Sequence, residues 1–478
     1  MGESDQRGRL FGTDGVRGVA GCDLTASLAL NLGIAAAAVL GAGGVGAATG
    51  DGSAPATAGA PVAAGAPVAA GAPVAVVGRD PRVSGEFLEA AVVAGLASAG
   101  VDVLRLGVIP TPGVAYLTQA LGATFGVVIS ASHNPARDNG IKFFGRGGIK
   151  LPDAVEDQIE DRLGSAPAAS TSFGRISDAE STQELYLDHL LATLPAEPGD
   201  HHPLAGLRVV VDCAHGAAYR LGPLALTRAG AEVIAIGAEP DGLNINAGYG
   251  STCLGTVAAA VLEHGAHAGV AYDGDADRCL AVDADGQLLD GDQILTVLAT
   301  ELAATGRLAG DAVVVTVMSN QGFHVAMRDA GIRVIETPVG DKHVSVAMRE
   351  GGYALGGEQS GHIIMLEHAP TGDGILTSLQ LLAAVHRLGL PMAAAAKMMR
   401  RYPQVLVNVP GDASQLGPEV DAAVTRAESA LGGNGRVLVR PSGTEPLIRL
   451  MIQASDTVLA EQVIGQLEAE VRLALAGH

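Results

Sequence analysis

The chain has 478 residues, more than one ordinary domain holds, so about three or four domains are expected. Its formal net charge of −21 repels nucleic-acid phosphates and excludes a nucleic-acid-binding protein. Its four cysteines show no CxxC spacing, and a chain of this size needs no disulfide framework. We therefore expect reduced thiols and a cytoplasmic location.

The N-terminal region shows no pattern of export or of membrane insertion. Its first residues, MGESDQRGRL, are polar and lack the apolar core of a secretory signal. The apolar stretch from Leu28 is rich in Ala and Gly and is interrupted by Asn31, which predicts a buried or amphipathic helix. From about Gly41 to Val74 an Ala/Gly/Pro repeat offers no large side chain to bury, which predicts a disordered insertion.

Three blocks of alternating apolar strands and helices follow, which predict three tandem α/β domains with mixed sheets. We place them at 1–164, 175–284 and 285–396. The first has strands at 74–78, 101–107 and 125–130 and helices at 84–100, capped by Ser84, and 112–122. The second has strands at 207–213, 232–237 and 268–272 and helices near 184–194 and after Ala217. The third has helices at 292–304 and 322–331 and strands at 312–318, 333–338 and 353–357.

The last block, 397–478, has a different pattern. Three strands, at 404–410, 435–441 and 447–454, precede one long helix with an apolar face, for which Asp456 or Thr457 is the expected cap. This order predicts a smaller α+β domain.

A possible nucleophile stands at the end of one predicted strand, where FGVVIS runs into the turn SHNP. Pro135 forbids helical continuation and Asn134 favours a turn, so Ser132 lies at the strand tip. Open α/β folds place ligands at the carboxyl ends of parallel strands. An exposed serine in an ordinary turn and a reactive serine both remain open.

A serine hydrolase does not fit this turn. The G-x-S-x-G elbow is missing, and His133, adjacent in the chain, is badly placed to take the proton of Ser132. Lys142, ten residues further on, could balance phosphate charge or move a proton. A solvated lysine is the alternative.

Three carboxylates at alternate positions, Asp273, Asp275 and Asp277, lie in the loop YDGDADRC between two apolar strands. Carboxylates so close together repel one another unless a cation lies among them. An EF-hand would need Gly and Glu where the chain has Arg278 and Ala284. Hard oxygen ligands that leave coordination positions open suit Mg²⁺ and phosphoryl chemistry, with Arg278 beside the transferring group.

Two further loops carry polar side chains between glycines. LGGEQSGHIIM offers Glu358, Ser360 and His362, which suit hydroxyl groups of a sugar, although a hairpin turn fits as well. VRPSGTEP offers a guanidinium, two hydroxyls and an exposed backbone, which suit a phosphate dianion, in residues Arg440, Ser442, Gly443 and Thr444. A nucleophile, a metal loop, a sugar loop and a phosphate loop make chemical sense only in one shared cleft.

These motifs resemble those of the α-D-phosphohexomutase superfamily, most closely its bacterial branch that acts on glucosamine phosphates. The match runs from FGTDGVRG (11–18) through SASHNP, DGDADR, GGEQSGH and YPQVLVNV (402–409) to RPSGTEP. It covers nearly the whole chain except the insertion. The chain departs from the expected pattern at NINAGYGST (244–252) and GDKHV (340–344), which concerns fine substrate contacts.

The resemblance implies four domains around a central cleft and a phosphorylated Ser132. It implies one Mg²⁺ held by Asp273, Asp275 and Asp277 with the Ser132 phosphate, and a sugar held by Glu358 and Ser360. The non-reacting phosphate would be held by the phosphate loop, which consists of Arg440, Ser442, Gly443 and Thr444. Arg17, Lys142, Arg278 and His362 match positions around the reacting groups.

The implied reaction interconverts glucosamine 6-phosphate and glucosamine 1-phosphate through a sugar bisphosphate, and supplies UDP-N-acetylglucosamine and cell-wall precursors. A phosphoglucomutase or phosphomannomutase is the nearest alternative. A metal-dependent phosphatase and a catalytically silent sugar-phosphate-binding protein are alternatives of other classes. The expected partner is a small sugar phosphate, and the sequence leaves the oligomeric state open, with a homodimer among the options.

Overall fold

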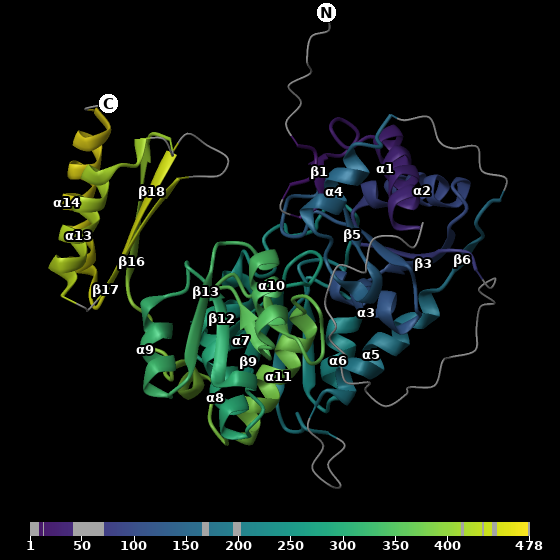
Figure 1. Cartoon of the computed structure of the whole chain (residues 1–478). Helices are drawn as coiled ribbons and strands as arrows, with labels where there is room; N and C mark the ends of the chain where they lie inside the picture. Colours follow the sequence, from purple (N-terminus) through teal and green to yellow (C-terminus); the bar gives the residue numbers. More distant parts are fainter. Residues whose placement is uncertain are drawn as a thin grey trace, which may run out of the picture. The chain divides into compact units, whose positions relative to one another are not determined.

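A computed structural model of the chain describes residues 9–12, 14–41, 71–164, 172–194, 202–412, 415–432, 435–441 and 447–476 (Figure 1). The chain divides into two compact units, one of residues up to Val317 with Ile335–Ala396, the other of Met318–Val334 with Lys397 onward. Among the described helices, none has both the length and the apolar character needed to cross a bilayer. Nearly all of the insertion predicted as disordered lies outside the described residues.

The first domain is built on a mixed sheet. Its elements are β1 (Val16–Val19), α1 (Ala26–Leu40), β2 (Val74–Arg79), α2 (Val83–Ser98), β3 (Asp102–Val108), α3 (Thr111–Ala120), β4 (Phe125–Ile129), β5 (Asp138–Phe144), η1 (Arg146–Gly148), α4 (Asp153–Glu160) and β6 (Ile176–Asp178). The six strands lie in the order β1-β5-β4-β2-β3-β6. β2 is parallel to β3 and β4, whereas β5 is antiparallel to β4.

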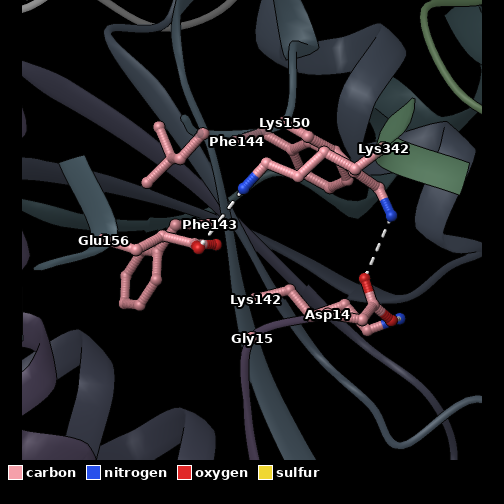
Figure 2. A pocket seen from close by; sticks show the side chains of 9 residues that line it. Asp14, Gly15, Lys142, Phe143, Phe144, Lys150, Glu156 and Lys342 are labelled. Atoms are coloured by element: carbon pink, nitrogen blue, oxygen red, sulfur yellow. Dashed lines mark hydrogen bonds and ion pairs between the residues drawn. The ribbon is translucent and has the colours of Figure 1, made fainter. Parts of the chain in front are cut away.

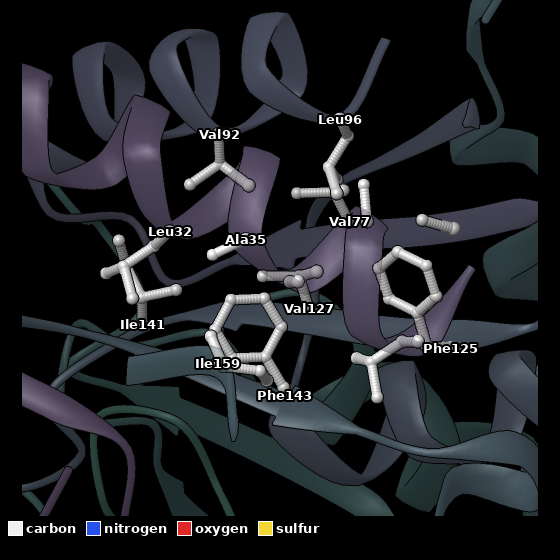
Figure 3. Close-up of a cluster of buried hydrophobic side chains, with 14 of the residues drawn as sticks. Leu32, Ala35, Val77, Val92, Leu96, Phe125, Val127, Ile141, Phe143 and Ile159 are labelled. Carbon is white, nitrogen blue, oxygen red and sulfur yellow. The ribbon is translucent and has the colours of Figure 1, made fainter. Parts of the chain in front are cut away.

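The core of this domain lies between the sheet and the helices α1, α2 and α4 (Figure 3). Phe125 and Val127 of β4 meet Leu32 of α1 and Leu96 of α2 there, all fully buried. The two helices cross closely because each carries a glycine at the contact. A β-carbon on Gly33 would lie 2.6 Å from the carbonyl oxygen of Val92, and one on Gly95 would overlap the carbonyl oxygen of Leu30.

The second domain repeats the arrangement of parallel strands followed by an antiparallel one. Its elements are η2 (Glu180–Thr182), α5 (Gln183–Ala192), β7 (Arg208–Asp212), α6 (Leu221–Arg228), β8 (Glu232–Ile236), α7 (Leu254–His264), β9 (Ala268–Tyr272), β10 (Cys279–Asp283) and β11 (Leu288–Leu289). The sheet order is β11-β10-β9-β7-β8. β7 is parallel to β8 and β9, and β10 is antiparallel to β9.

The third domain has the same plan in a smaller sheet. Its elements are α8 (Gly291–Ala304), η3 (Ala309–Asp311), β12 (Ala312–Thr316), α9 (Gln321–Asp329), β13 (Arg333–Thr337), α10 (Asp341–Gly351), β14 (Leu355–Gly357), β15 (Ile363–Met365), α11 (Gly374–Arg387) and α12 (Met392–Ala396). The order is β13-β12-β14-β15, with β14 parallel to β12 and antiparallel to β15. Helix α11 is buried from Gly374 to Val385.

The second compact unit contains the small C-terminal domain together with α9. Its own elements are β16 (Gln404–Pro410), α13 (Pro418–Leu431), β17 (Gly435–Pro441), β18 (Leu447–Ala454) and α14 (Thr457–Ala476). The strands form an antiparallel sheet, β16-β18-β17, and α13 and α14 pack side by side against it (Figure 1). The backbone N–H of Gln321 at the start of α9 donates to Gln453 Oε1 at 2.7 Å.

The predicted fold class is confirmed, and most predicted elements lie within a residue or two of their places. The three C-terminal strands match residue for residue. Asp456, not Thr457, caps the last helix, since its Oδ1 accepts from Leu459 N at 2.9 Å. The predicted cap Ser84 is wrong, because α2 begins at Val83 and Ser84 Oγ instead accepts from Asn139 Nδ2 at 2.9 Å.

The common plan fixes where polar loops can lie. In each α/β domain one strand, β4, β9 or β14, is parallel to an inner neighbour and then turns back into an antiparallel strand. The loops at these three turns are the ones that carry Ser132, the aspartates and Glu358. The three predicted polar loops therefore occupy equivalent positions in three domains.

The close crossing of α1 and α2 makes a specific prediction. Gly95→Ala should destabilise the chain by about 1–3 kcal/mol, because the added methyl group must push α2 away from Leu30. Urea unfolding followed by circular dichroism measures this change. Gly255→Ala in α7, where a β-carbon meets nothing within 4 Å, is the matched control and should shift stability by less than about 0.5 kcal/mol. Equal effects of the two substitutions would contradict the steric argument.

Candidate active site

Ser132 is held in an unusual backbone conformation at the turn between β4 and β5. Its φ angle is +51°, in the left-handed region, which costs about 1–3 kcal/mol for a residue with a β-carbon. The side chain is buried, and its Oγ donates to Asp273 Oδ2 at 2.6 Å. The nearby His133 Nδ1 lies at 3.3 Å. The structure thus brings the predicted nucleophile into direct contact with the predicted metal loop.

A fully buried arginine, Arg82, lies beneath this turn. Its Nη2 donates to the carbonyl oxygens of Ser132 and Asn134 at 3.0 and 2.8 Å, and its Nη1 donates to that of Asp138 at 3.0 Å. Asp80 balances the charge, at 2.9 Å from Arg82 Nε. Sequence analysis missed this pair, although two charged residues at the end of the apolar strand 74–79 were a usable signal.

The three aspartates form the only cluster of potential metal ligands in the part of the chain that the structure describes. One oxygen atom from each of Asp273, Asp275 and Asp277 lies within 4.8 Å of the others, and all three residues are buried. Burial, together with the negative charges of Asp277 and Asp275, raises the pKa of Asp273 well above its ordinary value. The Oδ1 atoms of Asp275 and Asp277 are buried and make no hydrogen bond. Such unsatisfied carboxylate oxygens fit a divalent cation.

Lys142 connects this cluster to the N-terminal motif. Its ammonium lies 2.9 Å from Asp275 Oδ2 and 2.7 Å from Asp14 Oδ2. Burial opposes the charge of Lys142, but Asp14 and Asp275 raise its pKa above the ordinary value, so the ammonium stays protonated. Thr111 Oγ1 also donates to Asp275 Oδ2, at 2.7 Å.

Asp14 is the centre of a second group of charges, which sequence analysis missed. It lies 2.5 Å from the guanidinium of the predicted Arg17 and 3.0 Å from Lys150 Nζ, and Lys150 also pairs with Asp341 at the start of α10. Burial alone would raise the pKa of Asp14, but these cations hold it well below its usual range. A lone Asp inside FGTDGVRG carried no signal of this role.

A small pocket of about 20 Å³ opens beside these lysines, with room for about one water molecule. Figure 2 shows Lys150 directed at Asp14, and Lys342 directed at Glu156 of α4, 3.4 Å away. The pocket is lined by Asp14, Gly15, Lys142, Phe143, Phe144, Lys150, Leu151, Glu156 and Lys342. Ammonium groups of the first and third domains therefore line one pocket.

His362 of the third domain contacts the cluster of aspartates. Its Nδ1 lies 3.4 Å from Asp277 Oδ2, and its Nε2 lies 3.5 Å from Asp341 Oδ2. Burial alone would lower the pKa of His362, but Asp277 and Asp341 raise it to about 8. The N–H of Gly372 donates to Nε2 at 3.1 Å and favours the unprotonated nitrogen. These opposed influences leave an imidazole that can hold or release a proton near neutral pH.

The sugar loop is ordered by its own contacts. Glu358 Oε1 accepts from Gly340 N at 3.2 Å, and Ser360 Oγ lies 3.4 Å from Glu358 Oε2.

Arg278 follows the aspartates, with Nε 3.8 Å from Asp277 Oδ1. Burial opposes its charge, but the three aspartates and Glu358 raise the pKa of Arg278.

The phosphate loop belongs to the second unit, and most of it lies outside the described residues. Of its predicted members, Arg440 on β17 is described and Ser442, Gly443 and Thr444 are not. Arg440 lies directly opposite Arg449 of β18. Burial and then the charge of Arg449 lower the pKa of Arg440. Two guanidinium groups on neighbouring strands suit an anion.

Comparisons with known proteins identify the family of the chain. Models of phosphoglucomutase/phosphomannomutase match at residues 53–169 (alpha/beta/alpha domain I), 184–286 (domain II), 290–402 (domain III) and 396–470 (C-terminal domain). A phosphoglucosamine mutase of Thermobifida fusca (strain YX) is 57% identical over 469 residues, which cover 97% of this chain and 98% of that protein.

Solved structures share the fold. A phosphoglucomutase/phosphomannomutase family protein of Burkholderia thailandensis aligns with a TM-score of 0.77 at 23% identity, over 98% of this chain and 97% of its own. An N-acetylphosphoglucosamine mutase of Aspergillus fumigatus, solved with GlcNAc-6P and magnesium, aligns with a TM-score of 0.58 at 18% identity, over 80% and 94%. The chain belongs to the phosphoglucomutase/phosphomannomutase family, within the α-D-phosphohexomutase superfamily.

Proposed function

We propose that this chain interconverts glucosamine 6-phosphate and glucosamine 1-phosphate, with Ser132 phosphorylated and a sugar bisphosphate as intermediate. The observation that carries the proposal is the contact of Ser132 Oγ with Asp273 inside the acidic cluster, 2.6 Å apart. The relative at 57% identity over nearly the whole chain, named a phosphoglucosamine mutase, supports the amino sugar as substrate. The product would feed UDP-N-acetylglucosamine and cell-wall precursor synthesis in the cytoplasm.

Mg²⁺ is the proposed metal, held by Asp273, Asp275, Asp277 and an oxygen of phosphorylated Ser132. The two buried carboxylate oxygens that make no hydrogen bond, on Asp275 and Asp277, support this ligand set. The fungal relative solved with magnesium supports the choice of metal. When bound, Mg²⁺ neutralises charge on the phosphoryl oxygens.

The chain's own residues would perform the transfer around this centre. The bond between Ser132 Oγ and phosphorus breaks, a bond from the sugar hydroxyl oxygen to phosphorus forms, and the hydroxyl proton passes to a base. Lys142 keeps its proton, so it acts through charge, as do Arg17 and Arg278. His362 is the proposed group that takes and returns the proton. The second half of the reaction is the same transfer in reverse from the other sugar oxygen.

The proposal also assigns the groups that bind the sugar phosphate. Glu358 and Ser360 would bind hydroxyl groups of the ring. The non-reacting phosphate would lie against Arg440 with Ser442, Gly443 and Thr444, and Arg449 adds a second guanidinium beside Arg440. A phosphatase would release inorganic phosphate, whereas a mutase must exclude water and return the phosphoryl group to the sugar.

Ser132→Ala tests the nucleophile. With Mg²⁺ and glucosamine 6-phosphate, phosphorus NMR should show conversion to the 1-phosphate by the wild type, without free phosphate, and a loss of at least about 10³-fold for the variant. Ser98→Ala, a serine of α2 whose Oγ donates to Gly95 O, is the matched control and should keep full activity. Release of inorganic phosphate by the wild type would show a phosphatase instead.

Asp277→Asn tests the metal site. Loss of one charged ligand should weaken Mg²⁺ binding at least about ten-fold in titration calorimetry, and EDTA should stop the wild-type reaction until Mg²⁺ is restored. Asp285→Asn, in the turn between β10 and β11, removes a carboxylate outside the cluster and should leave Mg²⁺ affinity unchanged. Equal Mg²⁺ affinity in both variants would rule out the proposed ligand set.

A further inference from the structure

The turn that carries Ser132 is held from two sides by side chains of two different domains. From the first domain, Arg82 Nη2 donates to the carbonyl oxygens of Ser132 and Asn134. From the second domain, Asn246 Nδ2 donates to the same two oxygens, at 2.9 and 3.0 Å. Both lone pairs of each carbonyl oxygen are therefore used, and the backbone on both sides of His133 is fixed.

Asn246 is itself held firmly. Its φ angle is +60°, a left-handed conformation that Asn tolerates better than most residues, and its N–H donates to Ala214 O at 2.8 Å. The neighbouring Ala214 N–H donates to Asp212 Oδ1 at 2.9 Å. Asn246 lies in the loop between β8 and α7, and its hydrogen bond to Ala214 anchors it to the turn that follows β7.

The turn that follows β7 also contacts the loop that carries the three aspartates. Ala217 N–H donates to Gly274 O at 2.8 Å, and a β-carbon on Gly216 would lie 2.5 Å from that oxygen. A β-carbon on Gly274 would lie 2.5 Å from the carbonyl oxygen of Ser132. Residues 212–217 therefore contact both the loop of the aspartates and Asn246. Asn246 in turn holds the backbone of the Ser132 turn through its two side-chain hydrogen bonds.

We propose that Asn246 is a positioning residue for phosphoryl transfer, which fixes Ser132 against the metal loop across the boundary of the first two domains. The inference rests on the proposed phosphoserine mechanism and adds to it a residue from NINAGYGST, outside the four predicted loops. Asn246 has no contact with Glu358, Ser360 or His362 among the described hydrogen bonds. Its loss should therefore slow the transfer without weakening sugar binding.

The size of the effect follows from the geometry of transfer reactions. Ser132 is in a strained conformation, and its Oγ points at Asp273 only while the turn keeps that shape. A displacement of about 1 Å in a reacting group can cost about 10²-fold in rate. We expect kcat to fall about 10–100-fold and KM for glucosamine 6-phosphate to stay within about three-fold.

Asn246→Asp is the decisive substitution, since Asp has the same shape and also tolerates positive φ but cannot donate to a carbonyl oxygen. Asn244→Asp is the matched control in the same turn. It loses only the donation from Asn244 Nδ2 to Glu239 O and keeps the acceptor for Asp241 N. Steady-state kinetics at saturating Mg²⁺, with the thermal midpoint and the phosphoserine resonance in phosphorus NMR, are measured for both variants.

The expected result is a low kcat, an unchanged KM and a displaced phosphoserine resonance for Asn246→Asp, with wild-type values for Asn244→Asp. Asn246→Gly, which removes the donor without adding charge, must show the same loss, and it decides alone if the Asp variant does not fold. A kcat within about two-fold of the control in either folded variant overturns the inference. A wild type that forms no phosphoserine would instead overturn the proposed function, so the two failures are distinguishable.

Discussion

Three carboxylates packed within 4.8 Å of one another in a buried site set the main electrostatic constraint on this molecule. In such surroundings each pair of like charges repels by several kcal/mol, which is about the size of a domain's whole stability. The cations that offset this repulsion come from different domains. Lys142 extends from β5 of the first domain, Arg278 follows the aspartates in the second, and His362 comes from the third. The complete set of charges around the aspartates therefore requires all three domains.

Backbone strain is concentrated in the same place. Among the described residues, six non-glycine residues have positive φ, and five of them lie in the turns around the site: Ser132, Ala214, His215, Asn246 and Ala276. Each costs about 1–3 kcal/mol and persists only where neighbouring contacts determine it. Arg82, Asn246 and the backbone of residues 212–217 supply those contacts. These contacts hold the strained turn in shape and so fix the orientation of the Ser132 side chain without a ligand.

Sequence analysis found the strands and the polar loops because both are local patterns. Runs of five to eight residues marked β4, β9 and the C-terminal strands, and the polar turns after β4 and β9 marked Ser132 and the aspartates. It could not find Asp14, Lys150 or Asp341, because their roles depend on ion pairs between distant segments. It also missed helix α11, which is buried from Gly374 to Val385. Arg82 and Asp80 were within reach, because two opposite charges within three residues of the end of an apolar strand can form a buried pair.

The contacts between α10 and the first domain have one more consequence. They are ion pairs, from Lys150 to Asp341 and from Lys342 to Asp153 and Glu156, at partly exposed positions. Water solvates the exposed pair of Lys342 with Asp153 when it separates, whereas separating the more buried pair of Lys150 with Asp341 costs more free energy. In the proposed mechanism a bisphosphate turns end over end, and the ion pairs of α10 are contacts that can separate and form again. Movement of α10 against the first domain would therefore break ion pairs, of which the pair of Lys342 with Asp153 is the most exposed.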